Sequence, residues 1–298
     1  MYYRNNKLII PDSINELHQV VLKNPDSIFF AGGTYLMKNH SLYPSNNTQK
    51  IISLEKIKDL FEVTRNIKHV EVGSMVTTNK LLEIGTLAFN DLLLDTLSNT
   101  ATHIVRNQIT IGGALATNNI RYSLPGTLTC MGASLELLDL SKNKIITKLV
   151  PIEKIYKNDA LLLEKGTLIK KIKIPLDTFD FERFYCVGDP IKEPSSTVIF
   201  AFRANINQTL LNNIKMSITF PTAGIHLSTL VPSELDGVQI PIIPKNASAI
   251  SKKYLSELDK DIKGVTPLQK ERAKRILQSV LYQIPPSRKF VEKSDKNF

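Results

Sequence analysis

Cysteine and tryptophan are scarce in this chain of 298 residues, which contains two cysteines and no tryptophan. Cys130 and Cys186 lie far apart in the sequence, and neither belongs to a CxxC pair. Two such thiols argue against a disulfide framework. They also cannot by themselves hold a four-cysteine iron–sulfur cluster or a zinc ribbon.

Spacings typical of metal sites and hydrolases are missing as well. The five histidines (His18, His40, His69, His103 and His226) show no HxxxH or HExxH pattern, so no metal site is expected. No Ser-His-Asp or Cys-His arrangement stands out, which argues against a hydrolase.

Long hydrophobic runs are absent too. No stretch approaches the ~18–20 continuous apolar residues of a membrane span, and the apolar run at residues 8–10 is too short for a signal peptide. We therefore expect a cytoplasmic protein without membrane contact. The composition of 42% hydrophobic and 22% charged residues is ordinary for a globular chain, and the length predicts two or three domains.

Acidic residues are outnumbered, because 28 Asp and Glu face 38 Lys and Arg, a net charge of +10. Such a charge is compatible with nucleic acid, an acidic partner or a phosphate-bearing cofactor. The lysines are spread along the chain without a basic block, which favours a solvated basic surface over a nucleic-acid-binding one.

The first part of the chain reads as a small βαβ unit. Strands are expected at residues 7–10, 27–31 and 50–54. A helix should begin at Ser13 with a capping box to Glu16, and a short helix should cover residues 34–39.

The middle of the chain predicts a second α+β unit. Paired strands are expected at 60–64 and 68–73, followed by a helix capped by Thr77 or Thr78 and closed by Gly85. Residues 87–105 are predicted to be mostly helical, with Ile104 on the apolar face. Further predictions are a strand-like Ile109–Ile111, a helix at 124–131, a strand at 134–140, and a hairpin of 161–163 with 168–174.

From about residue 179 the pattern changes to an antiparallel sheet followed by two helices at 247–258 and 266–282. The second helix has an apolar stripe that includes Leu268.

Two glycine pairs are the most informative features. A strand runs into Gly32-Gly33-Thr34, and a second pair, Gly112-Gly113, follows ~80 residues later. Glycine exposes backbone N–H groups that can donate hydrogen bonds to phosphate oxygens, so two such loops converging from different subdomains would form a cofactor site. The alternative is that both pairs are merely turns. Neither is a Walker loop or a GxGxxG loop.

Other candidate residues carry weaker signals. Arg106 either steers an anionic cofactor or pairs at the surface, and His103 is interpreted as structural. Cys130 lies in an apolar segment typical of a core thiol.

At the two glycine loops the sequence resembles the FAD-binding medium subunit of molybdenum hydroxylases, the family of xanthine dehydrogenase and carbon monoxide dehydrogenase. The family's AGGTDL corresponds to residues 31–36, its IRNxATIGGN to 105–114, its LLALGAxLEL to 128–137, and a C-terminal pattern to 261–277. These four motifs occur in order over nearly the whole chain.

The resemblance implies an α+β fold: a vanillyl-alcohol-oxidase-type (PCMH-type) FAD-binding domain of two α+β subdomains, and a small C-terminal domain of a three-stranded antiparallel sheet with a helical bundle. The implied boundaries are 1–57 and 58–177 for the subdomains, 178–288 for the C-terminal domain, and 289–298 for a disordered tail.

The implied function is electron transfer, without oxidation of the organic substrate by this chain. Iron–sulfur clusters on a partner subunit would pass electrons through FAD to NAD⁺ or another acceptor, and a further subunit would hold molybdopterin. The resemblance assigns no catalytic residue. The cofactor-binding residues that it implies are Phe29, Phe30, Ala31, Gly32, Gly33, Thr34, Tyr35, Leu36, Ile109, Thr110, Ile111, Gly112, Gly113, Asn119, Ser123, Leu168 and Tyr185.

The sequence departs from the family pattern at several positions. Tyr35 stands in place of the acid of GGTD, Ala114 in place of Asn, and Ser123 in place of the acid expected at the FAD ribose. Two alternatives therefore stay open: a flavin-free scaffold subunit of such a complex, and a different FAD-dependent reductase on the same fold.

Overall fold

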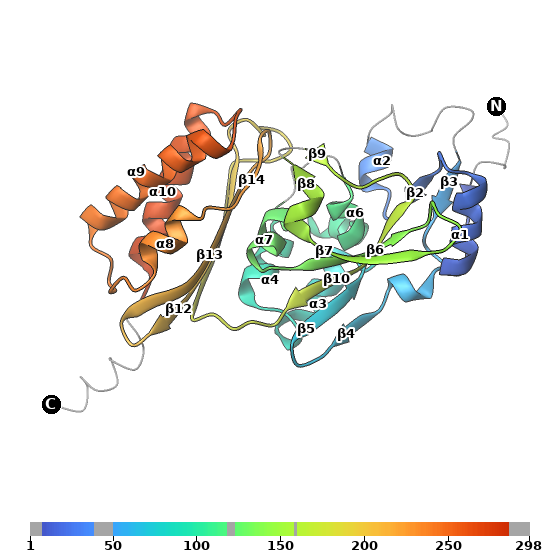
Figure 1. The fold of residues 1–298 in the computed structure, drawn as a ribbon, viewed down its shortest axis with the longest axis horizontal. Helices are drawn as coiled ribbons and strands as arrows, with labels where there is room; N and C mark the ends of the chain where they lie inside the picture. Colours follow the sequence, from blue (N-terminus) through green and yellow to red (C-terminus); the bar gives the residue numbers. More distant parts are fainter. Residues whose placement is uncertain (1–7, 39–49, 118–122, 158–159, 286–298) are drawn as a thin grey trace.

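The computed structural model describes residues 8–38, 50–117, 123–157 and 160–285. Figure 1 shows an elongated molecule with the N-terminal elements at one end and the C-terminal helices at the other. None of the helices in these ranges combines the length and the apolarity needed to cross a bilayer. The predicted tail at 289–298 and Asn119 lie outside the described residues, and the domain boundaries stay a prediction.

The N-terminal unit is a parallel sheet with strand order β1-β3-β2. The Oγ of Ser13 accepts a hydrogen bond from the N–H of Glu16 at the start of the first helix, as predicted. The carboxylate of Glu16 accepts from the N–H of Asp12 instead of Ser13, so the predicted capping box is only half formed. The elements are β1 (Leu8–Ile9), α1 (Ile14–Lys23), β2 (Ile28–Phe30), α2 (Thr34–Lys38) and β3 (Ile51–Ser53).

The central unit is an antiparallel sheet of order β4-β5-β10-β6-β7 with helices packed against it. Thr77 caps α3 through its side chain and Gly85 ends this helix, as predicted. The strands are β4 (Val63–Arg65), β5 (His69–Gly73), β6 (Ser134–Asp139), β7 (Ile146–Pro151) and β10 (Thr167–Pro175), with a separate pair, β8 (Tyr156–Lys157) and β9 (Ala160–Leu161). The helices are α3 (Thr78–Ile84), α4 (Asp91–Ser98), α5 (His103–Arg106), α6 (Ile111–Leu115) and α7 (Leu124–Cys130), and the 3₁₀ turns are η1 (Lys58–Leu60), η2 (Gly85–Leu87) and η3 (Ile152–Ile155).

Two predictions for the central unit are wrong. The hairpin of 161–163 with 168–174 does not form, because β9 pairs with β8 while β10 lies between β5 and β6. Ile104 is 80% exposed and not in the core, because the predicted helix at 87–105 breaks into α4 and α5 and α5 turns this side chain outward.

The C-terminal unit is a four-stranded antiparallel sheet, not the expected three-stranded one, because Gly224–His226 adds an edge strand. Leu268 is half-exposed, so the apolar stripe of the last helix does not include it. The elements are β11 (Phe181–Val187), β12 (Val198–Asn207), β13 (Leu210–Phe220), β14 (Gly224–His226), α8 (Leu230–Leu235), α9 (Pro244–Asp261) and α10 (Pro267–Gln283).

Helices α8, α9 and α10 cover one face of the C-terminal sheet, and α7 of the central unit packs against the other (Figure 1). The Oγ of Ser217 donates to the carbonyl of Gly126 at 2.7 Å across this second contact. Cys130 is a core thiol here, as expected, and burial raises its pKa to about 12. The thiol therefore stays protonated at neutral pH.

The N-terminal unit does not have a hydrophobic core of its own. Leu17 and Ile52 belong to a cluster that also contains Leu60, Met75, Leu138 and Leu168 of the central unit. The N-terminal sheet and its helix therefore bury their apolar side chains against β6 and β10.

Candidate functional site

The two glycine pairs lie against each other although they come from different units of the fold. A Cβ placed on Gly32 would lie only 1.6 Å from the carbonyl oxygen of Gln108, just before the second pair. A Cβ on Gly113 would lie 3.9 Å from the Cβ of Ala31. The two loops converge, as the sequence predicted for a shared site, and only glycine at position 32 permits this approach.

A cavity of about 220 Å³ lies between these loops. None of the described residues that line it carries a formal charge at neutral pH. The lining residues are Ile28, Phe29, Ala31, Gly32, Gly33, Thr34, Tyr35, Leu36, Ile109, Thr110, Gly113, Ala114, Ala116 and Thr117.

The first loop lines this cavity and has free backbone donors. Among the residues that the structure describes, the N–H groups of residues 32–36 have no hydrogen-bond acceptor. Gly33 makes the turn with a φ of +71°, a conformation that favours glycine, and its carbonyl accepts from the N–H of Met37. Successive free N–H groups of this kind bind anionic oxygens.

The second loop has the opposite character, because its N–H groups are already used. The N–H of Ile111 donates to Val76 O and that of Gly112 to Ser74 O, both at 2.9 Å. The N–H of Gly113 donates to Thr110 Oγ1 at 3.1 Å. The predicted strand at Ile109–Ile111 is wrong: Thr110 is the N-cap of α6, and only an isolated bridge joins it to Thr77. This loop therefore lines the cavity without offering free N–H groups to an anion.

A smaller cavity of about 90 Å³ adjoins the first and shares Phe29, Ala31, Gly113 and Ala116 with it. Gly112 and Leu168, both predicted site residues, line this second cavity. Leu168 reaches it from β10, so residues from three segments of the predicted site meet around the two cavities.

Four other predicted residues lie elsewhere. The ring of Phe30 packs under Gly33, and Ile111 is fully buried in the core beneath α6. Ser123 is buried at the start of α7, and the Tyr185 hydroxyl on β11 donates to Gln283 Oε1 at 2.9 Å. None of the four lines either cavity.

Arg106 does not face the cavity as a cation for a ligand. Its Nη1 donates to the carbonyls of Ser98, the last residue of α4, and of Ala101. His103 is exposed on α5, one residue after its N-cap. Arg106 therefore holds the segment between α4 and α5 together, and neither side chain lines the cavity.

Some lining residues were not among the predicted cofactor-binding ones. Ala116 and Thr117, in the run of small residues after the second glycine pair, line the first cavity. Ser74 and Thr167 line the second cavity, and the buried Oγ of Ser74 has no hydrogen-bond partner among the described residues. They come from strand ends that only the tertiary fold brings to the site.

Comparison with protein families decides which fold family this site belongs to. The family model described as the FAD binding domain in molybdopterin dehydrogenase matches residues 4–177, more than half of the 298 residues. The chain belongs to this family. The resemblance drawn from the glycine motifs is thereby confirmed, and FAD is the cofactor of the family.

Solved structures agree with this FAD-binding family at the level of fold. The chain superposes on quinoline 2-oxidoreductase from Pseudomonas putida 86 with a TM-score of 0.79, at 20% identity, covering 94% of this chain and 97% of that one. A carbon monoxide dehydrogenase chain from Hydrogenophaga pseudoflava gives a TM-score of 0.75 at 17% identity, covering 95% and 96%. The predicted α+β class is confirmed by these likenesses.

Curated relatives of the FAD-binding domain are much longer proteins. Indole-3-acetaldehyde oxidase of Zea mays is 28% identical over 220 residues, which are 67% of this chain and 15% of that protein. Probable aldehyde oxidase 2 of Oryza sativa subsp. japonica is 28% identical over 211 residues, 65% of this chain and 15% of that protein. The chain thus spans about one seventh of the length of these relatives.

Proposed function

We propose that this chain is the FAD-binding, electron-transferring component of a molybdenum hydroxylase-type complex. The observation that carries the proposal is the row of free N–H groups at residues 32–36, which faces a cavity walled by the second glycine loop. A pyrophosphate needs donors without competing acceptors, and the described residues of this cavity bring no carboxylate near those donors.

The residues present fit FAD. The N–H groups of residues 32–36 and the Thr34 hydroxyl would bind the pyrophosphate, and Ile109, Thr110 and Gly113 would wall it from the other side. The second cavity, with Gly112 and Leu168, would take an apolar part of the cofactor. The apolar lining would exclude water and hold the cofactor in one orientation.

When bound, FAD would act as an electron carrier between two redox centres. The protein's own contribution is binding and placement. Its two thiols cannot hold a cluster, and one of them, Cys130, is buried and stays protonated. The iron–sulfur and molybdopterin groups are proposed to reside on partner subunits, and NAD⁺ or another acceptor would receive the electrons.

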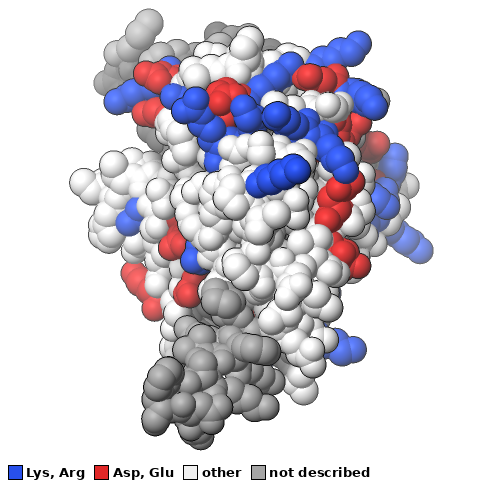
Figure 2. Space-filling model, turned by 90° about the vertical axis from the view of Figure 1, so that its left-hand side faces the viewer, with Lys and Arg blue, Asp and Glu red and all other residues white. Residues whose placement is uncertain are grey.

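The surface offers a means of recruiting such partners. Figure 2 shows the end of the molecule formed by the C-terminal helices. Lys and Arg side chains gather over the upper part of this view, with fewer Asp and Glu among them. With a net charge of +10, the chain would attract an acidic partner surface at low salt. Association that tightens at low ionic strength would support this part of the proposal.

A flavin-free scaffold is the second candidate function. It is favoured by Tyr35 and Ser123, which stand where the family pattern has acids that would bind the cofactor. In this case the two cavities would be remnants of a lost FAD site, and the chain would only hold partner subunits together.

A visible absorption spectrum separates these two functions. The purified full chain is mixed with excess FAD, desalted and scanned, and flavin bands that survive desalting are expected. Leu36→Glu is the variant to compare with the wild type, because it places a carboxylate at the half-buried edge of the cavity. It should abolish flavin retention while the circular dichroism spectrum stays unchanged. A folded wild-type chain that retains no flavin would instead support the scaffold.

A further inference from the structure

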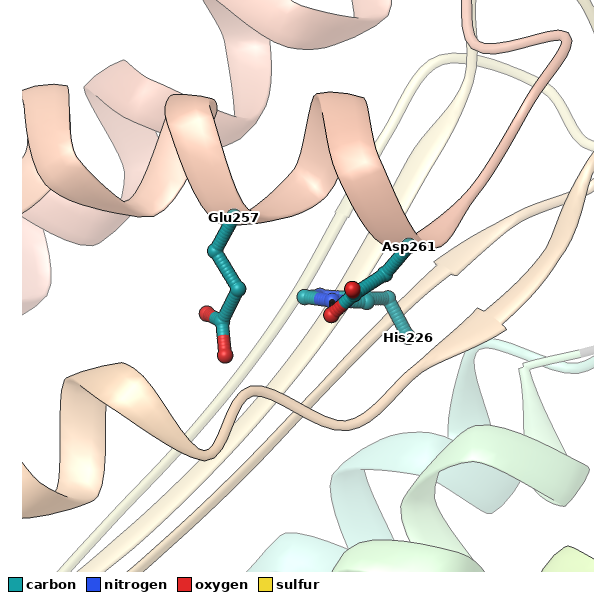
Figure 3. A group of neighbouring side chains, drawn as sticks. All are labelled: His226, Glu257 and Asp261. Atoms are coloured by element: carbon teal, nitrogen blue, oxygen red, sulfur yellow. Dashed lines mark hydrogen bonds and ion pairs between the residues drawn. The ribbon is translucent and has the colours of Figure 1, made fainter.

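His226, Glu257 and Asp261 form a group of side chains far from the cofactor cavities. His226 ends β14, and Glu257 and Asp261 lie four residues apart on one face of α9. Figure 3 shows the imidazole of His226 beside the Asp261 carboxylate, with the Glu257 carboxylate on the same side of the helix. His226 Nε2 lies 3.2 Å from Asp261 Oδ2, and one potential ligand atom of each residue lies within 4.8 Å of the others.

Two buried polar atoms at or beside this group have no hydrogen-bond partner among the described residues. His226 is only 3% exposed and its Nδ1 makes no hydrogen bond, and the hydroxyl of the fully buried Tyr254 makes none either. The two rings lie 5.5 Å apart between centroids. Unpartnered buried polar groups are rare and require an explanation.

A cation bound to Nε2 of His226 would make Nδ1 a hydrogen-bond donor. Coordination at Nε2 leaves the proton on Nδ1, and a metal-ligating histidine almost always donates that second N–H to a neighbouring acceptor. In this arrangement the hydroxyl of Tyr254, whose ring centroid lies 5.5 Å from that of the imidazole, would be the acceptor of this N–H.

Hydrogen bonds fix the position of the Glu257 carboxylate. Oε1 of Glu257 accepts hydrogen bonds from Thr229 N, Thr229 Oγ1 and Leu230 N, whereas Oε2 accepts only one, from Ser228 Oγ. Oε2 keeps a lone pair for a ligand.

We propose that His226, Glu257 and Asp261 bind a divalent transition metal ion, with Tyr254 as the hydrogen-bond partner of the ligating imidazole. One nitrogen and two carboxylate ligands suit Zn²⁺ better than Ca²⁺ or Mg²⁺, which prefer oxygen alone. Asp261 is 52% exposed on its side chain, which gives the ion a route from solvent. The ion would tie β14 to α9 and so brace the C-terminal unit. The histidine and its nearest carboxylate are 35 residues apart in sequence, so no short motif announces the site.

The test is zinc titration of the full chain after chelator treatment, followed by calorimetry, metal analysis and thermal unfolding. We expect one Zn²⁺ per chain at this site, a rise in the unfolding temperature, and a Kd at least about tenfold weaker in Asp261→Asn. Asp259→Asn is the matched control: it lies on the same helix, pairs with Lys270 and should bind zinc as the wild type does.

Tyr254→Phe separates a ligand site from adventitious binding. It removes only the proposed partner of Nδ1 and should weaken zinc binding by roughly tenfold while the near-UV spectrum outside the tyrosine signal stays native. Equal zinc affinity in the wild type and Asp261→Asn, or no zinc-dependent rise in unfolding temperature in the wild type, would overturn the proposal. Neither outcome depends on whether FAD binds.

Discussion

Gly32–Gly33 lie between β2 and α2, whereas Gly112–Gly113 lie in the first turn of α6, yet both pairs permit close packing. The first glycine of each pair allows another segment to approach: a Cβ at position 32 would strike Gln108, and one at position 112 would lie 2.4 Å from the Cβ of Ser74. Their hydrogen bonding differs completely. The first loop has free N–H groups, and the second has donated its own to Val76, Ser74 and Thr110.

This difference shows that a glycine pair in the sequence indicates close backbone packing, and that phosphate binding needs free N–H groups in addition. Which loop can hold an anion is decided by where each N–H already points, because a donor used in the fold is not available to a ligand. Both loops therefore shape the cavity, and only the first offers donors.

The largest effect is expected from Gly32→Ala, because the new methyl group would overlap the backbone of Gln108. We expect a loss of about 3 kcal/mol or more in the free energy of unfolding, measured by urea denaturation. Gly237→Ala is the control: its φ is +74° but no atom lies within 4 Å of the new Cβ, so it should cost only about 1 kcal/mol of backbone strain. Equal losses would show that the contact between the loops is not as close as described.

Thr110→Val addresses the second loop and should cost about 1 kcal/mol of stability, because it removes the cap on the N–H of Gly113. The side chain is buried and valine has nearly the same shape, so the lost hydrogen bond dominates. Urea denaturation of the FAD-free chain measures it. An unchanged midpoint would mean that the N–H of Gly113 is not held by Thr110 in solution.

Thr34→Val makes the converse change in the first loop. No described residue bonds to its hydroxyl, so the stability of the FAD-free chain should change by less than about 0.5 kcal/mol. The Kd for FAD should rise about fivefold through the loss of one hydrogen bond of about 1 kcal/mol. Flavin fluorescence titration measures this Kd. A larger effect on stability than on FAD binding would reverse the roles of the two loops.

The smallest effect is expected from pH. No carboxylate, imidazole, ammonium or guanidinium group lines the first cavity among the described residues, so FAD affinity should vary by less than about twofold over about pH 5 to 8, the range in which a histidine would titrate. A steep dependence in this range would place an ionisable group of the undescribed segments at the cofactor.

Stability should respond to acid instead. Hydrogen bonds from the Ser141 side chain, and then from its N–H, hold the pKa of Asp139 below its ordinary value of 3.8. A lowered pKa stabilises the fold fully above the ordinary value and loses this contribution as the pH falls below it. Asp139→Asn should therefore flatten the acid side of the stability profile, with unfolding at neutral pH as the reference.

Local signals in the sequence predicted much of the fold. Thr77 and Gly85 mark the two ends of α3 because a side-chain oxygen caps a helix and a glycine closes one through contacts only a few residues away. The convergence of the glycine loops was also predictable, because the family motifs give both in order.

The failures are non-local. Leu161 belongs to a strand that pairs with Tyr156 and not with β10, and strand pairing depends on which edges the fold leaves open. Leu268 and Ile104 have apolar side chains on exposed helix faces, and periodicity does not say which face meets the core. The short Ile-Thr-Ile run around Thr110 suggested a strand, but the Thr110 hydroxyl accepts a hydrogen bond from the N–H of Gly113 and so begins helix α6.

The shared core of the N-terminal unit affects the order in which the chain can fold during synthesis. Leu17 and Ile52 leave the ribosome well before Leu138 and Leu168, against which they pack. Until those later residues emerge, the first sheet has no surface to close upon, and its apolar side chains stay open to water or to chaperones. The loop that offers its N–H groups to the cofactor would thus be among the first segments made and among the last to become fixed.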